Sequence, residues 1–425
     1  MPIINQNPGF STTSNANFSS KSALFLRILR SVFPILLTMK NVRKVVIDEI
    51  RKVLNCKNPN NGCLYYCENC NDYKYVPFTC KSRFCPSCGS LYNKQRASSI
   101  GEHMLNVPHR HIVFAIPQQL RHYFLEDRSL LNVLFQAAHQ TFMDVMGNTF
   151  QGHINCGMIC VLHTFSRSSE WNPHIHAICT EGLFSDWGKW YPRPFIAYDQ
   201  LRLSWQKHLL SLLRSRIGPS FDPIAAQLRF QYPNGFFVGA GETPADYHGD
   251  VKQLVKYVAR YLGRPCIAVS RIDSFDGETV KFHYMAHAGN HKEVYREEKL
   301  SALDFVLRLC DHIQDPHFVN LRYYGLYSST GLESECMQKI HDNGITWLYD
   351  PARHAVRHYY SHWRGAMIRS FNIDPLICPH CGKMMDPLFY KINGKICFDL
   401  HKKGGKNHDP DSHDLDALYG NKSTA

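Results

Sequence analysis

The chain has 425 residues and a formal net charge of +12, with 24 histidines and 16 cysteines. Its length suits two or three domains with real cores, and its basic balance favours a polyanionic partner, although charge alone also fits a merely basic soluble protein. The apolar run from Ala23 to Leu37 contains two arginines and a proline. These residues exclude a clean signal segment or bilayer span and predict an amphipathic helix in a cytoplasmic protein with no membrane partner.

The first quarter of the chain predicts a metal-binding module. Residues 1–20 are rich in Asn and Ser and predict a disordered tail, and helical patterning follows to about Leu54. Seven cysteines then crowd between Cys56 and Cys88. Crowding in pairs favours metal over disulfides, and hence a reducing compartment. We expect residues 21–104 to form a helical, zinc-binding module that contacts DNA.

Two Cys-x2-Cys pairs stand in this module, Cys67 with Cys70 and Cys85 with Cys88. Four thiolates at this spacing are typical of a tetrahedral structural zinc site, which has no open position for catalysis. We therefore predict that these four cysteines bind one Zn²⁺. Three further cysteines could replace a ligand or belong to a second site: Cys56, Cys63 and Cys80.

Basic side chains flank the second cysteine pair, and Lys81 and Arg83 are the nearest before it. A closed metal site with basic flanks is suited to holding the DNA backbone, because lysine and arginine neutralise phosphates. We predict that Lys81 and Arg83 contact DNA.

From Pro108 onward, strands and helices alternate without a strict strand-helix repeat, which predicts an α+β domain over residues 105–330. We expect a central antiparallel sheet flanked by helices. The predicted strands are 110–116, 157–165, 173–179 and 279–285, and the predicted helices are 130–146, 198–217, 251–262 and 300–312.

The pattern weakens in the C-terminal region, residues 331–425. Cys378 and Cys381 are half of another zinc module, which Cys397 or His401 could complete. The polar tail from Lys402 predicts a flexible end.

The segment His174-Ile175-His176 places two imidazoles on one face of a predicted strand, because alternate side chains share a face. The preceding strand carries His163, and a hairpin turn near residues 168–170 would bring it opposite this pair. An isolated His-x-His pair is often only a surface feature. With His163 as a third ligand, these residues could hold a divalent cation with open positions, and manganese suits imidazoles better than magnesium. A second pair, His109 and His111, is interpreted as structural.

Tyr257 and Tyr261 are four residues apart on a predicted helix, so their phenols lie side by side. Two such tyrosines commonly serve packing, but near a metal site they are candidate nucleophiles. Basic positions that could meet phosphate share this helix: Lys252, Lys256 and Arg260.

The order of these motifs resembles the rolling-circle insertion-sequence transposases of the IS91 family, which are HUH-type enzymes with an N-terminal zinc-binding domain. The resemblance runs from about Ile28 to Pro387, and the block 80–88 is the closest local match. Further matches are the strand 110–117, the segments 162–165 and 173–176, the tyrosine pair and the segment 321–326.

The resemblance implies an HUH endonuclease-like fold and a nuclease that cleaves single-stranded DNA at transposon ends and targets. Cleavage would leave a 5′-phosphotyrosine and a free 3′-OH, and the strands would then be rejoined. It implies that His174 and His176 are ligands of Mg²⁺ or Mn²⁺, and that Tyr257 and Tyr261 are the nucleophiles. The ligand role of His163 comes from the hairpin argument instead.

Two other functions stay open. The same site would serve a plasmid replication initiator or a relaxase-like nickase, but the sequence has no Gly-x4-Gly-Lys-Ser/Thr and so no fused helicase of that type. A catalytically inactive, zinc-dependent DNA-binding protein is the other alternative. Which tyrosine attacks first is also open.

Overall fold

A computed structural model describes residues 20–102, 104–147, 153–194, 196–240, 265–287, 293–348, 364–365, 368 and 374–399. Within these residues the chain has the predicted α+β class, with helices flanking antiparallel sheets. The predicted helix at 251–262 lies outside the described residues. No described helix is both long and apolar enough to cross a membrane.

The central sheet carries the predicted histidine strands. In the described part of the chain it has five antiparallel strands, in the order β12-β4-β5-β3-β8. These are β12 (Leu321–Gly325), β4 (Gly157–Phe165), β5 (Trp171–Thr180), β3 (His109–Ala115) and β8 (Val238–Ala240). A tight turn joins β4 to β5, and Ser169 in it has a φ of 64°. The predicted hairpin between these two strands is confirmed.

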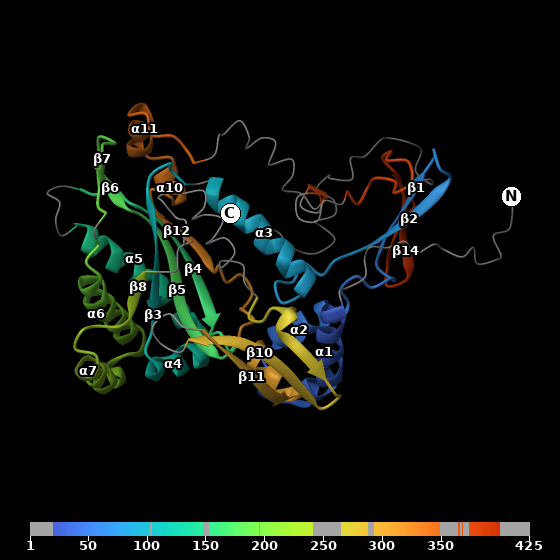
Figure 1. The fold of residues 1–425 in the computed structure, drawn as a ribbon, viewed down its shortest axis with the longest axis horizontal. Coiled ribbons are helices and arrows are strands. Elements are labelled where there is room, and N and C mark those ends of the chain that lie inside the picture. The colour runs from blue at the N-terminus through green and yellow to red at the C-terminus, as the bar shows by residue number, and fades with distance from the viewer. Residues whose placement is uncertain are drawn as a thin grey trace.

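The two faces of the central sheet pack against different elements. One face packs against α5 (Leu131–Gly147) and α6 (Tyr198–Ile217) to form the main core. The buried residues of this core include Leu162 and Ile175 from the sheet and Trp205 from α6. The other face includes Ile159 and Ile178, which pack on residues at and after the end of α3 (Pro86–Glu102). Figure 1 shows α5 and α6 on one side of the sheet and α3 on the other. Because side chains alternate along a strand, the histidines next to Leu162 and Ile175 belong to this second face.

A second core joins the N-terminal helices to a later part of the chain. α1 (Ser20–Thr38) and α2 (Lys44–Leu54) share it with β9 (Ile272–Phe275), β10 (Thr279–His287), β11 (Glu293–Ser301) and α9 (Ala302–Cys310). Ile28, Leu29, Phe282 and Phe305 are fully or almost fully buried there. The packing therefore crosses the sequence boundary expected at residue 104, because the apolar faces of α1 and α2 are covered by residues 267–313.

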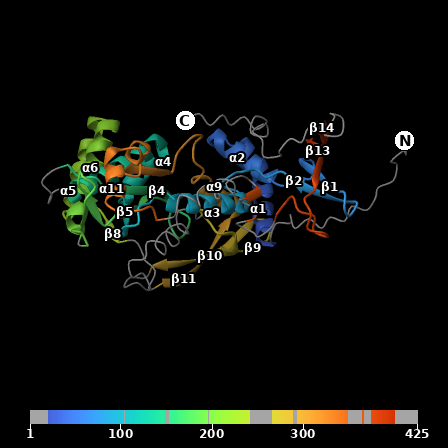
Figure 2. The same cartoon turned by 90° about the horizontal axis from the view of Figure 1, so that it is seen from above.

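The third unit is a small sheet that unites the N-terminal and C-terminal parts. Its order is β14-β13-β1-β2. These strands are β1 (Gly62–Cys67), β2 (Asp72–Pro77), β13 (Asp386–Ile392) and β14 (Lys395–Asp399). β1 pairs antiparallel with β13, so that Gly62 lies opposite Lys391. In both views this sheet lies at the end of the molecule opposite α5 and α6 (Figures 1 and 2).

Shorter elements complete the described chain. They are α4 (Arg121–Glu126), β6 (Gly182–Phe184), β7 (Trp190–Pro192), α7 (Asp222–Gln231), α10 (Ser329–Leu332) and α11 (Glu335–Asp342), with short 3-10 turns at Gln118–Leu120, Arg128–Leu130, Pro219–Phe221 and Val269–Arg271.

Candidate functional site

Three imidazoles converge on the second face of the central sheet. His163 on β4 lies directly opposite His174 on β5, and His176 follows two residues later on the same face. One nitrogen of each ring lies within 4.8 Å of the others. The Nε2 atoms of His174 and His176 are 3.1 Å apart. The β4–β5 hairpin therefore brings together the three histidines that the sequence singled out.

The remaining ring nitrogens of the β5 histidines are held by neighbours. Nδ1 of His174 is 2.7 Å from the carbonyl oxygen of Asn172, to which it donates. Nδ1 of His176 is 2.9 Å from Nε2 of His111 on β3, and the two rings stack. When Nδ1 carries the proton, the lone pair of Nε2 points toward the other imidazoles. Such outer hydrogen bonds orient histidine ligands and set their tautomer.

The environment of His174 favours its neutral form. Burial lowers the pKa of His174, and the positive charge of Arg121 lowers it further, whereas the hydrogen bond to Asn172 opposes the shift. A neutral imidazole is the form that binds metals. The donor set, three imidazoles with converging nitrogens, fits an imidazole-tolerant divalent ion such as Mn²⁺ better than Mg²⁺, which prefers oxygen.

The first cysteine cluster lies where α2 ends and α3 begins. Its four thiols come from Cys56, Cys80, Cys85 and Cys88. The Sγ atoms of Cys56 and Cys88 are 3.7 Å apart, those of Cys80 and Cys88 are 3.6 Å apart, and those of Cys85 and Cys56 are 3.7 Å apart. A tetrahedral zinc with bonds of about 2.3 Å requires sulfur separations of about 3.8 Å. The cluster fits one structural Zn²⁺.

The second cysteine cluster joins the two ends of the described chain. Cys67 and Cys70 lie at the β1–β2 turn, and Cys378 and Cys381 precede β13. Sγ of Cys67 is 3.5 Å from Sγ of Cys381, and Sγ of Cys378 is 3.9 Å from Sγ of Cys70. A hydrogen bond with the backbone of Lys383 lowers the pKa of Cys381 to about 6, which favours the thiolate that binds zinc. This cluster fits a second structural Zn²⁺.

The predicted grouping of Cys67, Cys70, Cys85 and Cys88 around one zinc is wrong. All four lie in clusters, but the β1–β2 hairpin carries the first pair away from the second. Of the three further cysteines, Cys56 and Cys80 complete the first cluster, whereas Cys63 belongs to neither cluster. The pair at Cys378 and Cys381 is completed by Cys67 and Cys70 rather than by Cys397, and His401 lies outside the described residues.

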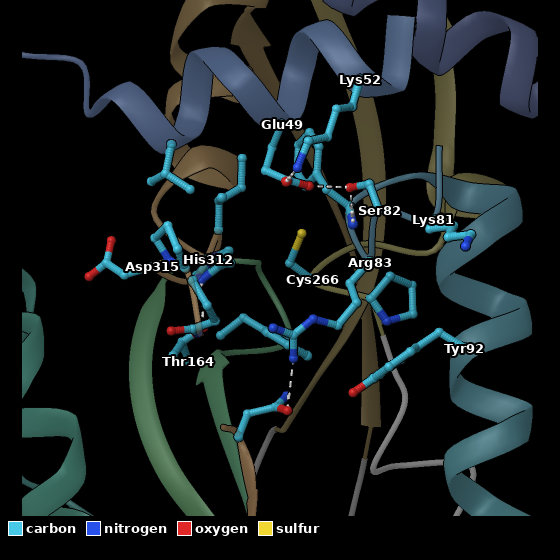
Figure 3. Close-up of a pocket in the computed structure, with 18 of the residues that line it drawn as sticks. Glu49, Lys52, Lys81, Ser82, Arg83, Tyr92, Thr164, Cys266, His312 and Asp315 are labelled. Atoms are coloured by element: carbon cyan, nitrogen blue, oxygen red, sulfur yellow. Dashed lines mark hydrogen bonds and ion pairs between the residues drawn. The ribbon is translucent and has the colours of Figure 1, made fainter. Parts of the chain in front are cut away.

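A cavity of about 1100 Å³ opens between the first cysteine cluster and the central sheet. We call it the knuckle groove. Residues 80–84, Pro86 and α2 line one wall, and residues 161–165 of β4 line the other. Figure 3 shows Lys81 and Arg83 on the first wall, with Arg83 extending toward the side of the groove that carries Thr164 and His312. The predicted DNA contacts Lys81 and Arg83 are exposed, and the candidate metal ligand His163 lines the same groove.

The tyrosine segment lies outside the described residues, as do its basic positions: Lys252, Lys256, Tyr257, Arg260 and Tyr261. The described chain stops at Ala240 in β8, which pairs with β3 in the central sheet. It resumes at Pro265, and Pro265 and Cys266 line the knuckle groove. The carbonyl of Cys266 accepts a hydrogen bond of 2.8 Å from Ser169 in the β4–β5 turn.

Comparisons with known proteins agree on one family. Residues 28–116 match the transposase zinc-binding domain, and residues 157–334 match the family described as putative transposase. The chain is 27% identical over 368 residues to the transposase for insertion sequence element IS801 of Pseudomonas savastanoi pv. phaseolicola, covering 82% of this chain and 85% of that protein. The chain belongs to the IS91 family of transposases.

A second relative of this transposase is the putative transposase y4qJ of Sinorhizobium fredii. The two chains are 23% identical over 294 residues, which cover 65% of this chain and 73% of the relative. No solved structure matches the transposase significantly.

The matched regions of the transposase correspond to separate parts of the site. The zinc-binding match contains the whole first cysteine cluster but only half of the second, whose other two cysteines lie at residues 378 and 381. The three histidines lie within the putative transposase match. The family therefore supports structural zinc and DNA as the partner of this chain.

Sequence reasoning missed one residue beside the histidines. His111 was interpreted as structural, yet it contacts the ring of His176. No local pattern in the sequence indicates this contact, because alternation puts His109 and His111 on the same face of β3 and the pairing of β3 with β5 joins distant parts of the chain.

Proposed function

We propose that this transposase nicks and rejoins single-stranded DNA through a tyrosine nucleophile, in rolling-circle-type transposition that depends on a divalent metal. The observation that carries the proposal is the convergence of His163, His174 and His176 on the sheet face that borders the knuckle groove. The described chain returns from the tyrosine segment to this same groove at Pro265.

The histidines would hold the metal with Nε2 of His174 and of His176 and with a ring nitrogen of His163. A divalent ion held there would polarise a phosphodiester oxygen and balance the charge that develops on it. The protein supplies the orientation, because Asn172 and His111 hold the outer nitrogens of the β5 histidines.

Tyr257 and Tyr261 are the proposed nucleophiles. The phenol oxygen of one attacks phosphorus and the bond to the 3′ oxygen breaks, so that the leaving oxygen takes up a proton and becomes a free 3′-OH. The DNA stays attached as a 5′-phosphotyrosine, and attack by a 3′-OH reverses the step. A phenol has a pKa near 10, so its proton must be removed as the attack proceeds. Phosphate contacts are assigned to three basic residues of the same segment: Lys252, Lys256 and Arg260.

A covalent-adduct assay tests this function. The full chain is incubated with labelled single-stranded DNA that carries the ends of its element and with Mn²⁺ or Mg²⁺, and adducts that survive denaturation are counted. We expect an adduct with the native chain and none with Tyr257→Phe combined with Tyr261→Phe. The single variants identify the tyrosine that attacks first. An adduct that persists in the double variant would refute the tyrosine chemistry.

His174→Ala separates catalysis from DNA binding in the same assay. It removes a metal ligand and leaves the basic surface, so we expect no adduct and an unchanged affinity for DNA. Unchanged cleavage would contradict the ligand role of His174.

The other two functions predict different results. A replication initiator or relaxase-like nickase would use the same site, but the named relatives are transposases, and insertion-sequence ends beside the gene would exclude the initiator. A catalytically inactive DNA-binding protein would bind the ends and form no adduct.

A further inference from the structure

The knuckle groove combines features that suit an unpaired DNA strand. One wall comes from the segment between Cys80 and Cys85, and we call it the knuckle wall. The other wall comes from β4, which carries His163 and Thr164. A strand that lies in the groove would pass from the zinc-held wall to the histidine cluster. Figure 3 shows Arg83 extending from the first wall toward the side that carries Thr164 and His312.

The charge of the groove favours phosphate near Arg83. Five basic and three acidic side chains line it. Each carboxylate pairs with a basic side chain: Asp48 with Lys44, Glu49 with Lys52 and Asp315 with Arg43. Arg83 instead contacts neutral groups, the amide oxygen of Asn320 at 2.9 Å and the ring of Tyr92 at 5.5 Å. In the described part of the chain no carboxylate forms an ion pair with Arg83, so its charge can bind a phosphate.

The groove also has surfaces on which bases can stack. Tyr92, with Arg83 over its ring, and the partly buried Phe84 line the knuckle wall. Aromatic rings and guanidinium planes stack on unpaired bases of any sequence, whereas base pairs inside a duplex hide their faces. This wall therefore favours single-stranded DNA over duplex DNA.

The first cysteine cluster holds the knuckle wall in place. Cys80 and Cys85 bracket residues 81–84, and the hydroxyl of Ser82 donates to Glu49 on α2 at 2.6 Å and accepts from the backbone N–H of Phe84 at 3.1 Å. Lys81 has a φ of 53°, a conformation that these surrounding contacts maintain. The side chain of Arg83 is thus presented from a firmly anchored loop, which lowers the entropy cost of binding.

We propose that the knuckle groove binds single-stranded DNA next to the cleaved bond, with Arg83 on a phosphate and Tyr92 stacked on a base. The inference rests on the proposed function, since it specifies the path of the strand toward the histidine cluster. It adds two specificity residues, Arg83 and Tyr92, which act on unpaired DNA before any cleavage.

Binding without cleavage tests the groove. The zinc-loaded full chain, without added Mn²⁺ or Mg²⁺, is titrated against a fluorescent oligothymidine of about 16 nucleotides, followed by anisotropy. We expect Arg83→Gln and Tyr92→Ala each to weaken binding by about tenfold. Tyr92→Phe should bind like the native chain, because stacking needs only the ring. Arg83→Gln should also reduce the slope of log affinity against log salt by about 0.7, the value for one lost phosphate contact with single strands.

Matched controls lie on the far side of the central sheet. Arg216→Gln on α6 and Phe230→Ala on α7 remove an exposed basic and an exposed aromatic side chain, and both should bind like the native chain. Equal affinity of the native chain for a duplex, or native affinity in both Arg83→Gln and Tyr92→Ala, would overturn the proposal.

The adduct assay on the same proteins separates this inference from the proposed function. Adduct formation together with native oligonucleotide binding by Arg83→Gln and Tyr92→Ala would refute the groove and leave the nicking chemistry standing. No adduct with the native chain, together with weakened binding by these variants, would support the groove and refute the nicking chemistry.

Discussion

Each histidine in the cluster has two ring nitrogens, and the contacts of the outer one decide what the inner one can bind. For His176 that contact is His111, at 2.9 Å. Outer partners of metal-binding histidines fix the tautomer, and their loss typically lowers metal affinity by about 10–100-fold.

We therefore expect His111→Ala to weaken Mn²⁺ binding by about tenfold or more. His111→Gln should restore part of the affinity, because its amide oxygen can accept the proton of Nδ1. Isothermal titration with Mn²⁺ measures both variants without any DNA. His109→Gln is the control, since His109 contacts the carbonyl of Val107 and the hydroxyl of Tyr327 instead. Native affinity in His111→Ala would show that His176 needs no such support.

For single residues, the sequence predicts well that the three histidines lie close together, because a short turn between two strands makes a hairpin and brings their residues opposite each other. His163 could be placed opposite the His174-Ile175-His176 segment from the position of the turn, but its exact partner, His174, depends on a register shift between His163 and Phe165. His111 could not be placed in this way, because β3 and β5 are more than fifty residues apart and their register depends on the whole sheet.

At the scale of helices and strands, the two cysteine clusters give a testable prediction about zinc binding. The first cluster takes two cysteines from one Cys-x2-Cys pair and two single cysteines, whereas the second takes two Cys-x2-Cys pairs that are distant in sequence. The chain should therefore bind two Zn²⁺, and each cluster should lose its own ion independently of the other.

We expect Cys85→Ser to lower the zinc content from two ions to one and to loosen the segment between Cys80 and Cys85. Cys381→Ser should also leave one ion, but it should loosen the pairing of β1 with β13. Elemental analysis gives the zinc content, and limited proteolysis locates the loosened segment. Cys63→Ser is the control because Cys63 lies outside both clusters, and burial raises the pKa of its thiol to about 11. A single zinc in the native chain would contradict the assignment.

Cysteine spacing predicts zinc but not which pairs share an ion. The Sγ atoms of Cys67 and Cys381 meet across 314 residues of chain, and no local pattern contains that contact. The strand that brings Cys381 to Cys67 is β13, and its pairing with β1 is equally distant in sequence.

At the scale of the whole molecule, hydrogen bonds connect the core of the N-terminal helices and α9 with the central sheet. Arg43, beside α2, bonds to Asp315 and to the carbonyls of Cys310 and Ile313. His312 donates from Nε2 to the carbonyl of Ser169 at 2.8 Å and lies 3.1 Å from the hydroxyl of Thr164. These bonds connect the N-terminal helices and α9 with the β4–β5 hairpin, so the histidine site depends on contacts that cross the sequence boundary expected at residue 104.

Two histidines, His109 and His312, make folding sensitive to acid. Burial lowers the pKa of His109 and of His312 to about 4 each, whereas an unfolded histidine titrates near 6.5. Between these values the unfolded chain binds protons that the folded chain does not. The free energy of unfolding is therefore highest above about pH 6.5 and falls as the pH drops toward 4, by on the order of 2 kcal/mol for each histidine at about pH 5.

Urea unfolding at about pH 7.5 and about pH 5 measures this effect. His312→Gln should be less stable than the native chain at the higher pH, since it loses bonds at a junction. It should lose less stability than the native chain between the two pH values, because it lacks the histidine whose pKa burial lowers at this junction. Acid also protonates the cysteine ligands, but that contribution is common to both proteins and cancels in the comparison. An equal loss in both proteins would mean that His312 takes up its proton in the folded state, and that the junction opens more readily than its burial implies.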